Sequence, residues 1–333
     1  MAAVTVQVKE AEPPMAGLRP MDPLRDLASV VDLIELGFWS ELDPQGRRML
    51  RQMRRVAERG HLARLVYGGA SGACGFVWVE DARLVGNLSL RRAYPAWRKG
   101  MLIGNVVVHP DYRGRGIARA LMEAALSAAR ERDAHWVGLE VRADNEVARG
   151  LYEHLGFAAV GETVHLVRPE GLPWLASPRL TRTHRWRKAT PKDKLSWAML
   201  AEALHPPLQA EVLEVRPNLY NFGGWERSFD LFLRGERAWS WLSEGETGEA
   251  LDMAVRVHAY GRDRFTTWDL LVRPRLGVEG AREAVARALA AGNPLLRKRP
   301  VVTMVEQGSA LIPILTGLGF HRHRILVQMR KGM

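Results

Sequence analysis

The sequence predicts an α/β protein built from two similar halves, each with a mixed, mostly antiparallel sheet flanked by helices. Apolar runs rich in β-branched residues alternate with amphipathic helical segments along the chain. The order of these segments repeats once, at an offset that stays between 163 and 168 residues. The length of 333 residues also exceeds the usual size of one domain.

The boundaries of the two halves follow from composition. The segment 170–183 begins with Glu170-Gly171-Leu172-Pro173, and such a run of turn residues is typical of a linker. We therefore expect a lead-in over residues 1–16, a first domain over 17–169 and a second domain over 184–333.

The elements of the first half are expected from hydrophobic spacing and turn residues. Apolar residues share one side of a helix over 23–38, and Asp43-Pro44 begins a second helix that reaches about Val56. Two further helices are expected, one after Gly116 and one after Asn145. Strands are expected at 18–20, 76–80, 84–90, 102–108, 136–141 and 160–168, where apolar residues run between turn signals.

The loop between the strand at 102–108 and its following helix has the chemistry of an anion site. Gly114 and Gly116 remove the side chains that would keep a phosphate away from the backbone. The helix start leaves several N–H groups unpaired, and the helix dipole adds partial positive charge there. Arg113 and Arg115 add full charges that suit phosphate oxygens.

A glycine-rich loop is also compatible with a dinucleotide-binding turn, a P-loop or an ordinary tight turn. The dinucleotide motif needs a third glycine, where this chain has Arg119, and no Gly-Lys-Ser/Thr follows for a P-loop. The segments after the loop distinguish these alternatives. A strand at 136–141 is followed by a short helix that begins at Asn145 and ends in Leu155-Gly156-Phe157.

This order of strand, Arg-x-x-Gly-x-Ala loop, helix, strand and Asn-started helix resembles the acetyl-CoA-binding core of the GNAT N-acetyltransferase superfamily. The resemblance implies that the loop binds the pyrophosphate of acetyl-CoA through its main-chain N–H groups, and that the strand before it pairs with the pantetheine arm. The implied cofactor-binding residues are Val106, Val107, Val108, Arg113, Gly114, Arg115, Gly116, Ile117, Ala118, Asn145 and Tyr152.

The resemblance also implies a general acid, Tyr152. This tyrosine keeps the family's separation of seven residues from Asn145, which is two helical turns on one face. Its ordinary pKa near 10 suits proton donation to a leaving thiolate. Tyr152 could instead be an aromatic core residue. Similarly, Val106–Val108 could be ordinary strand residues, although backbone binding and side-chain packing are compatible.

The general base is left open by the sequence. The expected topology places four residues near the centre of the active site: Glu140, Glu80, His109 and Asn105. We take Glu140 as the candidate base. A carboxylate can act on the amine through water, whereas an asparagine can only position a water molecule.

The second half departs from the first where the chemistry is expected. When the two halves are aligned, Gly277 replaces Arg113, Val278 replaces Gly114 and Glu279 replaces Arg115. In the following helix Gly308 replaces Asn145 and Leu315 replaces Tyr152. We therefore expect a tandem protein whose degenerate second copy has lost cofactor binding. The expected roles of this second copy are to complete the substrate cleft and to stabilise the first copy.

Composition limits the remaining possibilities. Cys74 is the only cysteine, so no intrachain disulfide or cysteine-based metal site can form, which fits a reducing cytoplasm. No signal peptide and no apolar run of about 18 residues is evident, so no membrane span is expected. The net charge of +11 could indicate a nucleic-acid partner, but no nucleic-acid motif accompanies it, and a local basic patch at the cofactor is favoured.

The expected function is an acetyl-CoA-dependent N-acetyltransferase, without a metal, that transfers acetyl directly to a primary amine of a small molecule or protein in a ternary complex. The alternative is a non-catalytic acyl-CoA-binding or regulatory protein of the same fold. The acceptor cannot be identified from the sequence. A monomer and a homodimer both remain open, because the two copies can already form an internal pseudo-dimer.

Overall fold

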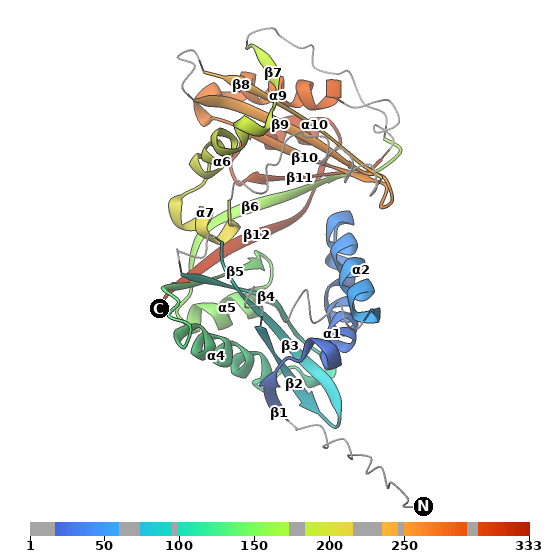
Figure 1. Cartoon of the computed structure of the whole chain (residues 1–333), viewed down its shortest axis with the longest axis vertical. Helices are drawn as coiled ribbons and strands as arrows, with labels where there is room; N and C mark the ends of the chain where they lie inside the picture. Colours follow the sequence, from blue (N-terminus) through green and yellow to red (C-terminus); the bar gives the residue numbers. More distant parts are fainter. Residues whose placement is uncertain are drawn as a thin grey trace, which may run out of the picture.

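The computed structural model describes residues 17–59, 74–94, 99–172, 184–215, 235–245, 250–291 and 299–333. The expected lead-in over 1–16 and most of the expected linker, 173–183, lie outside the described residues. Within these ranges the chain forms one twelve-stranded mixed sheet with helices on both faces (Figure 1). The expected α/β class is thereby confirmed.

In the first half, each expected element is present with its ends within two residues of the predicted ones. Helices α1 and α2 begin at Pro23 and Pro44, where Asp22 and Asp43 accept hydrogen bonds from backbone N–H groups of the first turn. The elements are β1 (Gly17–Pro20), α1 (Pro23–Phe38), α2 (Pro44–Glu58), β2 (Cys74–Glu80), β3 (Arg83–Arg92), β4 (Gly100–Val108), α4 (Ile117–Arg130), β5 (Trp136–Arg142), α5 (Glu146–His154) and β6 (Ala158–Arg168).

The second half repeats this order. Its elements are β7 (Trp186–Lys188), α6 (Lys194–Ala203), α7 (Pro207–Leu213), β8 (Glu236–Glu244), β9 (Leu251–Tyr260), β10 (Phe265–Val272), α9 (Gly277–Ala291), β11 (Val301–Glu306), α10 (Leu311–Gly317) and β12 (His321–Gly332). The internal repeat seen in the sequence is therefore also a repeat of structure.

The two halves exchange their last strands. The strand order is β1-β2-β3-β4-β5-β12-β6-β11-β10-β9-β8-β7. Strand β12, from the second half, inserts between β5 and β6, and β6 in turn pairs with β11. Figure 1 shows β6 and β12 crossing the middle of the molecule side by side. The division at 170–183 thus separates the chain in sequence, while the sheet runs through both halves.

Alternation along the strands defines two faces of the sheet. On one face, Val327 and Met329 of β12 belong to the hydrophobic core that also contains residues of α4. On the same face, Val164 and Leu166 of β6 belong to the core that also contains residues of α9. Gln328 lies between Val327 and Met329 and therefore points to the opposite face. That opposite face carries α1 on the first half and α7 on the exchanged strands.

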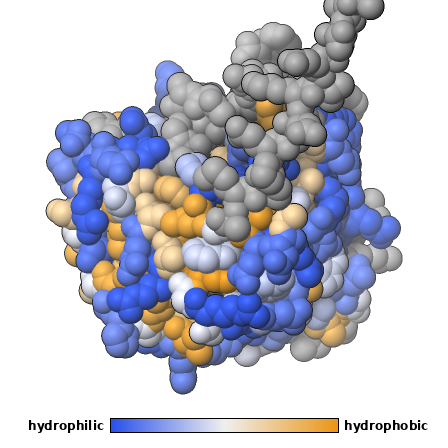
Figure 2. Space-filling view, turned by 90° about the horizontal axis from the view of Figure 1, so that it is seen from below, coloured by the Kyte–Doolittle hydropathy of each residue, from blue (hydrophilic) through white to orange (hydrophobic). Residues whose placement is uncertain are grey.

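The end of the molecule formed by the first half has a largely hydrophilic surface. Figure 2 shows this end, with apolar residues gathered in the middle of the face and hydrophilic residues around them. In the described part of the chain, no helix is both long and apolar enough to span a bilayer.

Candidate active site

Strands β4 and β5 separate halfway along their length. They pair in parallel only between Gly100–Ile103 and Trp136–Leu139. Beyond that point Asn105 adopts a positive φ of 51°, and the register between β3 and β4 shifts, as in a β-bulge. The Asn87 Nδ2 group donates to the Asn105 carbonyl oxygen over 2.9 Å and holds this bend. Past the bend, no described strand pairs with β4 on its β5 side.

The valines after this bend pack their side chains while that backbone edge stays open. Val107 is buried in the core formed with α1, and Gly37 of α1 is required there because a Cβ would lie 2.6 Å from Val107 Cγ2. Val106 and Val108 pack on the other face, in the core that contains α4. The two alternatives for these valines, core packing and backbone binding, are therefore compatible.

The glycine loop opens into free space at the start of α4. Gly114 and Gly116 have φ values of 77° and 78°, a conformation that favours glycine. A Cβ at either position would meet no atom within 4 Å, so backbone conformation rather than crowding requires these glycines. Ile117 anchors the first turn in the core with 2% of its surface exposed. The first N–H groups of α4 have no partner within the helix and lie beside this space.

The two loop arginines contact the protein as well as facing solvent. Arg113 Nε donates to the Val108 carbonyl oxygen over 3.3 Å. Arg115 Nη1 donates to Glu80 Oε1 over 2.9 Å, and its guanidinium lies 4.8 Å from the ring centre of Tyr112. Glu80 is therefore engaged in an ion pair with Arg115 at the loop, and this pairing disfavours Glu80 as the general base.

Tyr152 and Asn145 have different environments on α5. Asn145 caps the helix, and its Oδ1 accepts a hydrogen bond from the Ala148 N–H over 3.1 Å. Tyr152 is 6% exposed and packs with Val106 and Val108 in one core. Burial raises the pKa of the Tyr152 phenol to about 12, so the hydroxyl keeps its proton at neutral pH.

Glu140 lies beside the point where the strands separate. Leu139 pairs with Ile103, so Glu140 and the exposed Gly104 are the next residues on the two strands. Gln328 Nε2 donates to Glu140 Oε1 over 2.8 Å. Gln328 is fully buried and reaches the carboxylate because β12 lies next to β5.

The other base candidates are placed differently. His109 is 8% exposed, and its Nε2 lies 2.9 Å from Arg83 Nη2. Asn105 lies at the bend, where its Nδ2 donates to Ser89 Oγ over 3.2 Å. Of the four candidates, Glu140 is the carboxylate that lies at the strand opening.

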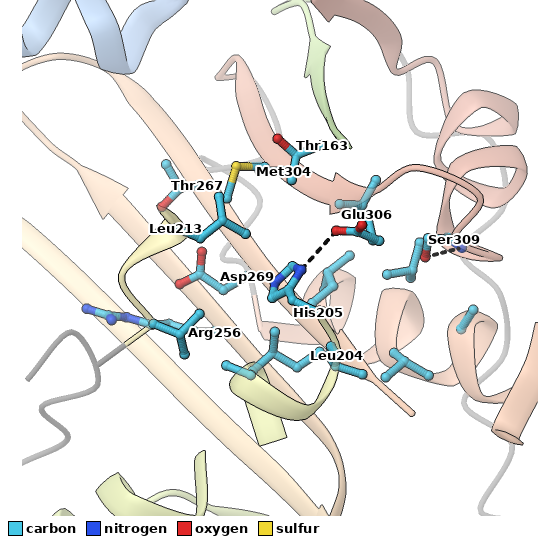
Figure 3. A pocket seen from close by; sticks show the side chains of 18 of the residues that line it. Thr163, Leu204, His205, Leu213, Arg256, Thr267, Asp269, Met304, Glu306 and Ser309 are labelled. Carbon is cyan, nitrogen blue, oxygen red and sulfur yellow. Dashed lines mark hydrogen bonds and ion pairs between the residues drawn. The ribbon is translucent and has the colours of Figure 1, made fainter. Parts of the chain in front are cut away.

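A hydrogen-bonded chain leads from Glu140 into the second half. Gln328 Oε1 accepts from Gln209 Nε2 over 3.0 Å, and Gln209 Nε2 also donates to Glu306 Oε2 over 3.1 Å. His205 Nδ1 completes the chain at 2.8 Å from Glu306 Oε2 (Figure 3). Sequence reasoning missed Gln328 and Gln209, because neither belongs to a motif and only the strand exchange brings them to Glu140.

The corresponding region of the second half lacks the glycine loop. Four residues, 113–116, separate the 3₁₀ turn Pro110–Tyr112 from α4, whereas α9 begins at Gly277 directly after the turn Pro274–Leu276. Val278 and Glu279 are consequently part of the first helical turn. Leu315, at the position aligned with Tyr152, is fully buried.

No group of three or more histidine, cysteine, aspartate or glutamate side chains in the described ranges is arranged to hold a metal ion.

Residues 41–157 match the family model of the acetyltransferase (GNAT) family. A streptothricin acetyltransferase from Streptomyces lavendulae is 42% identical over 69 residues, covering 21% of this chain and 36% of that protein. A putative ribosomal protein bS18-alanine N-acetyltransferase from Bacillus subtilis is 37% identical over 108 residues, covering 32% of this chain and 53% of that protein. The aligned regions therefore span between about a third and about half of these relatives.

Two solved structures share the fold over almost the whole chain. A tandem GNAT protein from the clavulanic acid biosynthesis pathway is 18% identical, with a TM-score of 0.58, and the match covers 95% of this chain and 98% of that one. A GCN5-related N-acetyltransferase from Sphaerobacter thermophilus is 15% identical, with a TM-score of 0.60 and 95% of each chain covered. The expected tandem arrangement is confirmed by these matches.

Proposed function

Because residues 41–157 belong to the GNAT acetyltransferase family, we propose that this chain is an acetyl-CoA-dependent N-acetyltransferase. It transfers acetyl directly to a primary amine of a small molecule or protein while both substrates are bound. The observation that carries the proposal is the open edge of β4, with the glycine loop at its end and Glu140 beside it. The name of one similar protein, a putative ribosomal protein bS18-alanine N-acetyltransferase, supports an amine acceptor.

Two features of the first half, the glycine loop and the open edge of β4, support acetyl-CoA as its ligand. The free space in front of Gly114 and Gly116 supports access of a pyrophosphate to the backbone N–H groups of residues 114–118, whereas the Arg113 N–H already donates to the Pro110 carbonyl oxygen. The open edge of Val106–Val108 offers backbone groups to the amides of the pantetheine arm. Asn145 lies at the start of α5 and completes the proposed binding set. When bound, acetyl-CoA supplies the activated acetyl group as a thioester.

Glu140 and Tyr152 handle the protons in this proposal. The Glu140 carboxylate accepts a proton from the acceptor ammonium, directly or through water, so that a neutral amine attacks. The Tyr152 hydroxyl, which stays protonated because its pKa is raised to about 12, donates a proton to the departing sulfur. A backbone N–H near Val107, on the open edge of β4, is proposed to stabilise the oxyanion.

The second half has a supporting role in this proposal. It provides Gln328, which holds the Glu140 carboxylate, and it lacks the loop and the tyrosine that a second catalytic site would need. We propose the boundaries 17–169 and 184–333 for the two copies, with the strand exchange joining them. A cytoplasmic location and a monomer or homodimer remain predictions.

The proposal is tested by incubating the purified chain with acetyl-CoA and a panel of primary amines while free thiol is measured. We expect acetyl-CoA-dependent thiol release that requires an amine and is lost in Glu140→Gln. Tight CoA binding without thiol release for any amine, including peptide N-termini, would instead favour the non-catalytic acyl-CoA-binding protein.

A further inference from the structure

The second half contains a cavity of about 830 Å³ where β10 and β11 separate. These strands pair only between Thr266–Trp268 and Val301–Thr303. Beyond that point Asp269 on β10 and Met304 on β11 line the cavity from the two diverging strands. Helix α2 of the first half and helices α6 and α7 contribute further walls (Figure 3). The volume lies within the range of small-molecule sites, which is roughly 300–1,000 Å³.

The basic side chains of this cavity lie beside acidic side chains or are directed away from Asp269. Arg48 forms ion pairs with Glu236 and with Asp263 at 2.8 Å. His258 Nε2 lies 3.0 Å from Glu236 Oε2. His205 lies 2.8 Å from Glu306.

Two further arginines line the cavity. Arg273 Nε donates to the Leu251 carbonyl oxygen over 2.8 Å. Arg256 is the register partner of Asp269, but in Figure 3 its guanidinium extends away from the Asp269 carboxylate. Neither arginine therefore neutralises Asp269 by direct contact in the described structure.

Among the described residues, Asp269 is the acid of this cavity that has no hydrogen-bond or ion-pair partner. Within the described ranges no hydrogen bond or ion pair reaches its carboxylate, although the side chain is half-buried. Burial raises the pKa of Asp269, while the charge of Arg256 opposes this effect. A half-buried carboxylate without a partner is a favourable place for a cationic ligand, because the ligand would supply the missing counter-charge.

The rest of the cavity suits an apolar body. Leu204, Leu213 and Leu271 line it together with Met304, whose side chain is 45% exposed. The loop that could hold a pyrophosphate is missing on this side, and Glu279 adds negative charge at the start of α9. These features disfavour a second CoA and favour a ligand with an apolar part and one positive charge.

We propose that the cavity between β10 and β11 binds an organic ammonium ion, with the charge at Asp269 and the apolar part against Met304 and the leucines. The residues that line this cavity include none of the residues proposed for catalysis or cofactor binding, and its ligand need not be acetylated. The proposal therefore does not depend on catalysis by the first half.

The test uses hexylamine as the probe and hexan-1-ol as its neutral analogue, with affinities for the full-length chain measured by ligand-observed NMR in the absence of CoA. We expect hexylamine to bind at least ten-fold more weakly to Asp269→Asn than to the unchanged chain. Asp133→Asn, which removes an exposed acid outside the cavity, should bind with unchanged affinity. Met304→Lys places a competing ammonium in the cavity and should weaken binding to a similar degree, which covers the case in which Asp269→Asn does not fold.

Three outcomes would overturn the proposal. The first is equal affinity of hexylamine for the unchanged chain and for a folded Asp269→Asn or Met304→Lys variant. The second is equal affinity of hexan-1-ol and hexylamine for the unchanged chain. The third is displacement of hexylamine by CoA in a Gly114→Glu variant, which would assign the cavity to a pantetheine arm. Failure of the acetylation assay leaves all three comparisons interpretable, because none of them requires turnover.

Discussion

Gln328 donates a hydrogen bond from Nε2 to Glu140 Oε1 over 2.8 Å, although 188 residues separate them in the sequence. The contact exists because β12 crosses into the first half and its register places Gln328 opposite Glu140. The carboxylate proposed as the general base is therefore held by the last strand of the chain.

Replacing Gln328 by methionine removes the amide donor while keeping similar volume. Because a hydrogen bond to a charged group contributes roughly 1.5–3 kcal/mol, we expect kcat/KM to fall about ten-fold while CoA affinity is unchanged. Steady-state kinetics and calorimetric titration with CoA measure the two effects. Arg330→Met, which removes another contact of β12, the ion pair with Glu211, is the matched control and should retain turnover. Unchanged kinetics in a folded Gln328→Met variant would remove Gln328 from the site.

Tyr152→Phe should lower turnover far more than CoA affinity. The substitution keeps the ring that packs with Phe157 at 6.2 Å between centres, so it removes only the hydroxyl. Loss of a general acid typically costs roughly 10²-fold or more in rate. Turnover at saturating substrates and the dissociation constant for CoA distinguish the two roles of Tyr152. Full turnover in Tyr152→Phe would show that this residue serves only the core.

Asp43 should stabilise the contact between the two halves at neutral pH, and this contribution to the free energy of unfolding should be lost in acid. Burial opposes ionisation, but contact with His165, the Gly46 N–H and the charge of Arg324 on β12 together lower the pKa of Asp43 to about 2. A carboxyl with a lowered folded pKa stabilises the fold above its unfolded value near 4, and this stability is lost as the pH falls toward 2. We expect the free energy of unfolding to drop by about 2 kcal/mol over this window.

The Asp43 prediction is checked by urea unfolding at pH 5, 4, 3 and 2.5. The variant Asp43→Asn should be less stable at pH 5 and should lose less stability on acidification. Parallel pH dependence of the two proteins would contradict the assignment.

The strand exchange predicts a specific disulfide. Arg142 on β5 and Leu326 on β12 are register partners, so cysteines at both positions should crosslink within one monomer in a Cys74→Ser background. The matched control pairs Arg142→Cys with Val305→Cys on β11, two strands further away, and should stay reduced. Crosslinking by the control pair instead would mean that the strands are arranged differently. Mass spectrometry after mild oxidation reads out both pairs.

Local features of this fold could be predicted because they depend on short segments. The helices at Pro23 and Pro44 follow aspartate caps, and the loop conformation at Gly114 and Gly116 follows from two glycines before a helix. The internal repeat also indicated the second half correctly, since its elements recur in the same order.

The strand exchange could not be predicted from the same patterns. Strands β6 and β12 both alternate apolar and polar residues, so either could pair with β5 without exposing its apolar side. Tertiary packing decides between them, and this choice places Gln328 beside Glu140. Similarly, alignment placed Val278 and Glu279 in a loop, whereas α9 begins before them.

The central claim is that the first half binds CoA through unpaired main-chain N–H groups of its glycine loop, and that the second half does not bind CoA. Calorimetric titration of CoA into the unchanged chain, Gly114→Glu and Val278→Glu tests this claim most directly. Gly114 has a φ of 77°, so a glutamate there adds both backbone strain and negative charge, whereas Val278 is 47% exposed on a helix. We predict one CoA per chain, an affinity roughly a hundred-fold lower in Gly114→Glu, and an unchanged affinity in Val278→Glu. Two CoA molecules per chain, or equal loss of affinity in both variants, would contradict the account.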